Sequence, residues 1–162
     1  MGSPKKSAVR DRQVESETVA EAGGGAAVSD AELLGIGARD VSSLLQEVDA
    51  GFDFSSFTRL QKAMDVPRYQ LAELVRIKPR TLTRREVEGK LHPDESERLL
   101  RAARLFQKAI ELFEGDAAAA RTWLTTSNRA LSGKRPIDLA RTEPGAREVE
   151  NLIGRLEHGV FT

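Results

Sequence analysis

The pattern of apolar and polar positions is clearest near the end of the chain. From Ala146 to Val160, apolar residues recur at steps of three and four, the spacing that places side chains on one face of a helix. The residues of this stripe are Ala146, Val149, Leu152, Ile153, Leu156 and Val160. Because the stripe runs almost to the last residue, no later element follows to cover it. We therefore expect it to pack on an earlier segment or on another protein.

A longer helix is predicted between Pro93 and Gly115. Pro93 suits a first helical position, Asp94 and Glu95 complement the positive end of the helix, and Gly115 suits its C-terminal cap. Two adjacent apolar seams give this helix an apolar face that is wide enough to contact both the core and a second subunit. The seams predict a homodimer through Leu99, Ala102, Leu105, Phe106, Ala109 and Leu112. A fully buried central helix in a monomer explains the same seams.

Three shorter helices precede the long one. The first covers residues 54–64 and is followed by a short break. Pro67 closes this break, because proline suits the first position of the second helix. Pro79 marks another stop and start, and a basic third helix over residues 80–88 is closed by Gly89. Two short helices separated by a tight turn, followed by a basic third helix, are typical of a helix-turn-helix.

Composition divides the chain into five regions. Residues 1–30 are rich in Ser, Glu, Ala and Gly, and they predict a disordered tail, with a short partner-binding tail as the alternative. Residues 31–53 form a poorly defined helical segment interrupted by glycines. A helix-turn-helix domain over 54–92, a long connecting helix over 93–114 and a further helical domain over 115–162 follow. No stretch alternates with period two, so the predicted fold class is all-α.

The domain over residues 115–162 is expected to hold short helices and one longer final helix. Asp116 can cap the first of them. Pro136 begins a short helix that is expected to run into Thr142. Thr142 or Glu143 then precedes Pro144, where the final helix starts.

Charge is unevenly distributed along a chain that is neutral in total. The sequence holds 25 Lys and Arg against 25 Asp and Glu, but residues 59–90 hold nine basic residues against four acidic ones. This local excess can follow a phosphate backbone, although it is also compatible with an ordinary solvated face. The absence of cysteine and of a long apolar run predicts a reducing, cytoplasmic location and no membrane span.

The turn and third helix of the helix-turn-helix carry the candidate DNA-binding residues. In this motif the N-terminal part of the recognition helix meets base edges, and the preceding helix lies across the backbone. Arg80, Thr81, Arg84 and Arg85 are expected to project from the recognition helix. The full set, including phosphate contacts from the second helix, is Arg68, Tyr69, Gln70, Lys78, Arg80, Thr81, Thr83, Arg84 and Arg85. Arginine-rich helix ends without a DNA role are the alternative.

The sequence offers little for catalysis. His92 and His158 each lie beside a turn, without other ligand-type residues at metal-binding spacing. Glu148, Glu150 and Glu157 are more typical of solvated helix carboxylates than of an acid-base pair. We therefore predict no catalytic residues, no metal and no cofactor, and a protein that is not an enzyme.

An ordered series of positions in the last forty residues resembles a known family. The positions are Trp123-Leu124, Asn128, Ala130-Leu131, Gly133, Pro136, Leu139, Thr142, Gly145, Val149-Glu150, Leu152 and Glu157-His158-Gly159. Together they resemble the toxin-binding domain of Xre/MbcA/ParS antitoxins. The segment from about Phe57 to Phe113 is similar to the helix-turn-helix half of the same family, so the resemblance covers residues 57–162.

This resemblance implies an antitoxin that blocks the active site of a RES-domain toxin, an enzyme that consumes NAD, and that represses its own operon. It implies that Trp123, Leu131, Pro136 and Val149 build the domain. The residues implied to form or flank the toxin contact are Leu152, Ile153, Arg155, Leu156, Glu157, His158, Gly159, Val160 and Phe161. The expected partners are the toxin, operator DNA and a second copy of the chain. A dimeric helix-turn-helix regulator without a toxin partner is the alternative.

Overall fold

The computed structural model describes residues 29–159. All regular elements over these residues are helical, which confirms the all-α fold class. Two isolated β-bridges are the extended pairings within the described part of the chain. In chain order the elements are α1 (Asp30–Leu34), α2 (Val41–Ala50), α3 (Phe54–Met64), α4 (Arg68–Leu74), α5 (Pro79–Glu88), α6 (Pro93–Leu112), α7 (Ala117–Thr125), the 3-10 helix η1 (Arg129–Leu131), α8 (Pro136–Leu139) and α9 (Glu143–Glu157).

Residues 29–53 are more regular than the sequence indicated. Ser29 caps α1 through a capping box, so the predicted disordered tail is wrong at its last two positions. The rest of that predicted tail, residues 1–28, lies outside the described residues. Asp40 caps α2 by accepting a hydrogen bond from the Ser43 N–H at the N-terminus of that helix. Because α1 packs on α3 and α6, and α2 on α6, both helices belong to the folded body.

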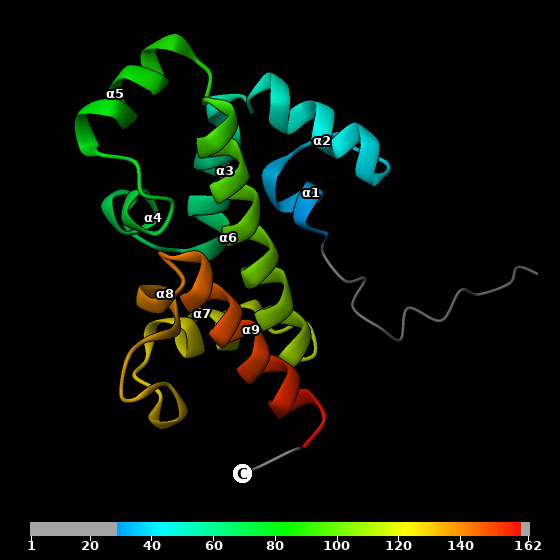
Figure 1. Cartoon of the computed structure of the whole chain (residues 1–162), viewed down its shortest axis with the longest axis vertical. Helices are drawn as coiled ribbons and strands as arrows, with labels where there is room; N and C mark the ends of the chain where they lie inside the picture. Colours follow the sequence, from blue (N-terminus) through cyan, green and yellow to red (C-terminus); the bar gives the residue numbers. More distant parts are fainter. Residues whose placement is uncertain (1–28, 160–162) are drawn as a thin grey trace, which may run out of the picture.

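The central element is α6, which contacts α1, α2, α3, α7 and α9 (Figure 1). Both predicted seams of this helix face the chain's own core, and Leu112 is half-buried against it. The seam residues that are fully buried are Leu99, Ala102, Leu105, Phe106 and Ala109. The prediction that they form a homodimer interface is therefore wrong, because the other helices of the same chain already cover them. The structure shows the alternative, a central helix buried within one chain.

The helices α3, α4 and α5 lie close to their predicted bounds. Pro67 is the cap of α4 rather than its first residue, whereas Pro79 is the first residue of α5. Gly89 ends α5 in the left-handed conformation, with φ 74°, as its predicted capping role requires. Figure 1 shows α5 at the upper end of the molecule, far from the C-terminal end of α9.

The C-terminal helices surround the other half of α6. Asp116 caps α7 and Thr142 caps α9, so the two expected cap positions are occupied as the sequence indicated. The start of α9 passes so close to α8 that a Cβ atom at Gly145 would overlap the carbonyl oxygen of Leu139. Glycine at this position lets the two helices meet at a sharp corner.

Candidate functional surfaces

The turn between α4 and α5 is held from outside by α6. Arg98 of α6 donates from Nε to the carbonyl oxygen of Val75 at 2.6 Å, and it also pairs with Asp94 at 3.1 Å. Ile77 is buried within the turn. These contacts fix the direction in which α5 leaves the body of the protein.

The inner side of α5 carries a buried ion pair. Arg85 donates from Nε to Glu95 of α6 at 2.8 Å and also pairs with Glu88 at 3.0 Å. Glu95 in turn accepts from the backbone N–H of His92 at 2.8 Å. Arg85 and Glu95 are only 4% and 5% exposed. The expectation that Arg85 projects towards DNA is therefore wrong, because its guanidinium joins α5 to α6.

The titration of this pair reflects its surroundings. The hydrogen bond to Glu95 raises the pKa of Arg85 above its ordinary value, although burial opposes the shift. Burial raises the pKa of Glu95, but the hydrogen bonds from Arg85 and the His92 N–H outweigh it and leave that pKa below its ordinary value. Both groups are therefore charged at neutral pH.

At the start of α4, Arg68 has a partner within the chain. Its guanidinium makes a two-pronged contact with Glu86 of α5, at 3.2 and 2.6 Å, and lies 5.5 Å from the ring centre of Phe54. The hydrogen bond from Arg68 lowers the pKa of Glu86. Arg68 therefore fixes α4 against α5, and the structure does not present it as a free phosphate ligand. Tyr69 beside it is 65% exposed, and Gln70 is half-buried.

The outer side of α5 is open to solvent. Lys78, Arg80, Thr83 and Arg84 are exposed and Thr81 is half-buried. Arg80 has no ion-pair partner among the described residues, and Arg84 makes a long 3.8 Å contact with Glu88. The structure thus brings together, on one accessible surface, the predicted residues of the turn and recognition helix other than Arg85.

The apolar stripe of α9 faces the chain's own core. Leu152 and Ile153, two of the implied toxin contacts, are 4% and 2% exposed and pack in the same cluster as α6. The expectation that they contact a foreign protein is therefore wrong, because α6 and α8 cover that face. Of the two places where the stripe was expected to pack, the structure shows an earlier segment of the chain.

The last turn of α9 remains accessible. Arg155 and Leu156 are half-buried, and Glu157, His158 and Gly159 are exposed. We call these five residues the α9 end. Val160 and Phe161, also implied toxin contacts, lie outside the described residues.

The residues implied to build the C-terminal domain lie in or against its core. Leu131, Pro136 and Val149 are buried. Trp123 is half-buried and packs with its ring centre 6.4 Å from that of Phe113, just beyond the end of α6. The tryptophan thus joins α7 to the central helix.

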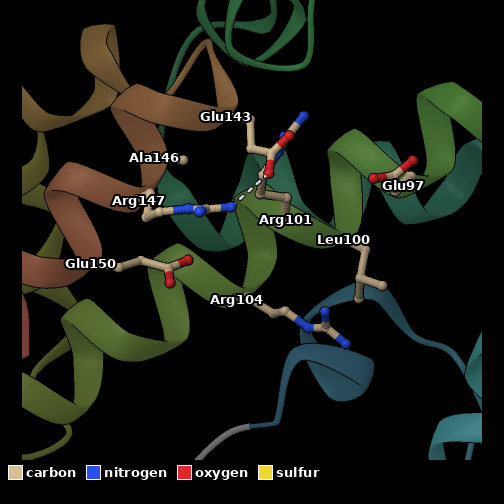
Figure 2. Close-up of a pocket in the computed structure, with 8 residues that line it drawn as sticks. All are labelled: Glu97, Leu100, Arg101, Arg104, Glu143, Ala146, Arg147 and Glu150. Carbon is tan, nitrogen blue, oxygen red and sulfur yellow. Dashed lines mark hydrogen bonds and ion pairs between the residues drawn. The ribbon is translucent and has the colours of Figure 1, made fainter.

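A shallow hollow between α6 and α9 gathers charged residues (Figure 2). Arg147 reaches Glu143 at 2.9 Å within it, while Arg104 points to α1 and pairs with Asp30 at 2.9 Å. Its lining residues are Glu97, Leu100, Arg101, Arg104, Glu143, Ala146, Arg147 and Glu150. Three arginines and three glutamates balance, so the hollow favours neither a cation nor an anion.

Residues 29–159 contain no group of three or more His, Cys, Asp or Glu side chains placed to hold a metal ion. No helix of the same residues combines the length and apolar character needed to cross a bilayer.

Sequence reasoning missed Glu95 and Arg98, which position the recognition helix. Both were visible in the sequence only as residues of the first turns of α6. Glu95 lies three residues after His92, the spacing of a capping box, and Arg98 lies four residues after Asp94. Neither spacing shows that the side chain also reaches another helix.

Comparison with known proteins finds two successive domains in the chain. Residues 43–104 match the antitoxin Xre-like helix-turn-helix domain, and residues 108–159 match the antitoxin Xre/MbcA/ParS C-terminal toxin-binding domain. The first match begins within α2 and ends within α6, so it extends beyond the predicted 54–92 on both sides.

Two relatives that match most of the chain are both named antitoxin Xre. The chain is 37% identical over 130 residues to antitoxin Xre of Yersinia enterocolitica, covering 80% of this chain and 88% of that protein. It is 32% identical over 116 residues to antitoxin Xre of Photorhabdus laumondii, covering 71% and 78%. With both domains matched in order and most of each relative covered, the chain belongs to the Xre/MbcA/ParS antitoxin family.

Proposed function

We propose that this antitoxin inhibits a RES-domain toxin that degrades NAD, by placing the α9 end over the toxin's active site. The observation that carries the proposal is that the α9 end is the accessible final part of a matched toxin-binding domain whose apolar stripe is already buried. The match supports a toxin partner, and the resemblance of the motif residues supports the RES class.

The chemistry of the α9 end suits a protein contact. Leu156 offers a half-buried apolar group, and its neighbours in the sequence, Arg155, Glu157 and His158, offer a guanidinium, a carboxylate and an imidazole. Stable interfaces combine such an apolar centre with a polar rim. Within residues 29–159, the ion-pair contact of Arg155 is a long one of 3.6 Å with Glu148, so little is lost when Arg155 turns to a partner.

The second part of the proposal is repression of the chain's own operon. A helix-turn-helix domain with Lys78, Arg80 and Arg84 exposed on one surface supports DNA binding in the cytoplasm. Any homodimer on DNA must use a surface other than the buried seam of α6. A regulator without a toxin is the rival function, and the matched toxin-binding domain counts against it.

A growth assay tests the toxin partnership. The product of the neighbouring reading frame is expressed alone, with the wild-type chain, and with Arg155→Ala or Arg147→Ala. Arg147 is the matched control, because it is an exposed arginine of the same helix, two turns before the α9 end. We expect growth to stop when the neighbouring product is expressed alone. The wild-type chain and Arg147→Ala should restore growth, and Arg155→Ala should restore it only weakly. Equal rescue by both variants would remove the α9 end from the interface.

A further inference from the structure

Val87 is an apolar residue that the fold does not use. It is 85% exposed on α5, the largest value among the described large apolar side chains that remain exposed, which are Val41, Leu45, Tyr69 and Val87. Valine is also a poorer helix former than alanine, because its branched side chain loses freedom against the preceding turn. Neither packing nor helix propensity therefore accounts for valine at this position.

The position of Val87 on the helix shows what surrounds it. Arg80, Thr83, Arg84 and Val87 follow one another at steps of three, one and three, so they share one face of α5, which we call the α5 face. The four residues also line one shallow hollow of the surface. The hydroxyl of Thr83 donates to the carbonyl oxygen of Pro79 at 3.1 Å, within the helix. Its methyl group is the part left for a partner.

The α5 face is positive even though acids lie near it. Glu86 pairs with Arg68, and Glu88 pairs with Arg85, which also pairs with the buried Glu95. Among the described residues, Arg80 has no ion-pair partner, and Arg84 has one long contact, at 3.8 Å to Glu88. A surface that combines two arginines with two methyl-bearing side chains complements the DNA major groove, where guanine offers acceptors and thymine offers its C5 methyl group.

From this arrangement we infer that Val87, together with the methyl group of Thr83, reads thymine methyl groups in the operator. The inference rests on the proposed DNA binding and adds a base preference to it. Seven residues separate Arg80 from Val87, which is about 10 Å along the helix at about 1.5 Å per residue. That length spans about three base pairs. The recognised thymine therefore lies about three base pairs from the base that Arg80 contacts.

The test begins with selection of binding sites from random DNA duplexes by the full wild-type chain. The selected duplex is then remade with deoxyuridine at each thymine in turn, which removes only the C5 methyl group. Binding is measured by fluorescence anisotropy for wild type, Val87→Ala and Leu45→Ala. Leu45 is the matched control, because it is an exposed apolar residue on α2, outside the α5 face.

For wild type and Leu45→Ala we expect one deoxyuridine to weaken binding about fourfold, the effect of losing one buried methyl group. Val87→Ala binds the thymine duplex about fourfold more weakly and loses nothing further with deoxyuridine at that position. Circular dichroism checks that the variant is folded, as its exposure predicts.

Three other results would overturn the inference in different ways. If no duplex is enriched by the wild-type chain, DNA binding itself fails, and the base preference fails with it. If a duplex is enriched but Val87→Ala keeps the full sensitivity to deoxyuridine, DNA binding stands and the role of Val87 does not. A change in sedimentation of Val87→Ala, with unchanged DNA affinity, would assign Val87 to a protein contact instead.

Discussion

The residue that best explains the placement of the recognition helix is Glu95. Its carboxylate joins α5 to α6 through Arg85 and also accepts from the start of its own helix, so one side chain sets both a helix cap and an interhelical contact. Ser96 beside it accepts from the backbone N–H of Phe52 at 2.8 Å and donates to the carbonyl oxygen of His92. Through these two adjacent residues, the start of α6 is bonded to Arg85 of α5, to the backbone of Phe52 and to the backbone of His92.

Glu95→Gln is predicted to lower the free energy of unfolding by about 3 kcal/mol at pH 7, because it leaves the buried Arg85 charge with a single partner. The lowered pKa of Glu95 means that its contribution is present above the ordinary glutamate pKa and is lost as pH falls through the folded value. The wild type should therefore approach the variant as the solution is acidified below about pH 4.3.

Denaturant unfolding at neutral and acidic pH measures this difference. Glu97→Gln is the control, since Glu97 is exposed on the same helix and has no ion-pair partner among the described residues. A gap between wild type and Glu95→Gln that stays constant down to pH 3 would contradict the assigned ion pair.

Two glycines of α9 give opposite predictions. Gly145→Ala should destabilise the protein by about 1–3 kcal/mol, because the new Cβ overlaps Leu139 and forces α8 and α9 apart. Gly154→Ala should stabilise it by about 0.5–1 kcal/mol, because its Cβ meets nothing and alanine is the better helix former. Thermal unfolding of both variants provides the comparison, and effects of the same sign would contradict the packing described for the start of α9.

At the scale of helices, local signals were predictable from the sequence, and their partners were not. Asp116, Thr142 and Gly89 each act within about one turn of chain, so they identify helix ends directly. An apolar stripe such as that of α9 shows which side is buried, but tertiary packing decides what buries it. The toxin contacts at Leu152 and Ile153 were predicted wrongly for this reason.

The direction of Arg85 was unpredictable for a related reason. Arg85 lies on the same helix as Arg80 and Arg84, and nothing in the local sequence separates it from them. Its buried ion pair with Glu95 of another helix makes the difference. The same limit applies to Arg68, whose partner Glu86 lies eighteen residues away. Local periodicity places such residues on a helix, and the fold then decides which of them remain available to DNA.

For α5 we predict that Arg80→Ala with Arg84→Ala weakens operator binding and flattens its dependence on salt, because fewer counterions are released from DNA. Rescue from the toxin should be unchanged, since neither residue contacts the C-terminal helices. Titrations at several salt concentrations, beside the Arg147→Ala control, measure this. An unchanged salt slope would place the phosphate contacts elsewhere.

Over the whole molecule, the two candidate surfaces are separated by the length of α6. Figure 1 shows α5 at one end and the last turn of α9 at the other, with the central helix packed against both halves. The core is one continuous cluster that runs from α1 to α9. In the proposed function, a toxin on the α9 end and DNA on the α5 face would therefore contact opposite ends of the molecule.

The most direct measurement is the rate of NAD consumption by the product of the neighbouring reading frame, titrated with the wild-type chain, Arg155→Ala and Arg147→Ala. We predict that consumption stops near stoichiometric wild type or Arg147→Ala, and that Arg155→Ala is needed in clear excess. Undiminished NAD consumption at saturating wild-type chain would contradict the proposal that the α9 end closes the toxin's active site.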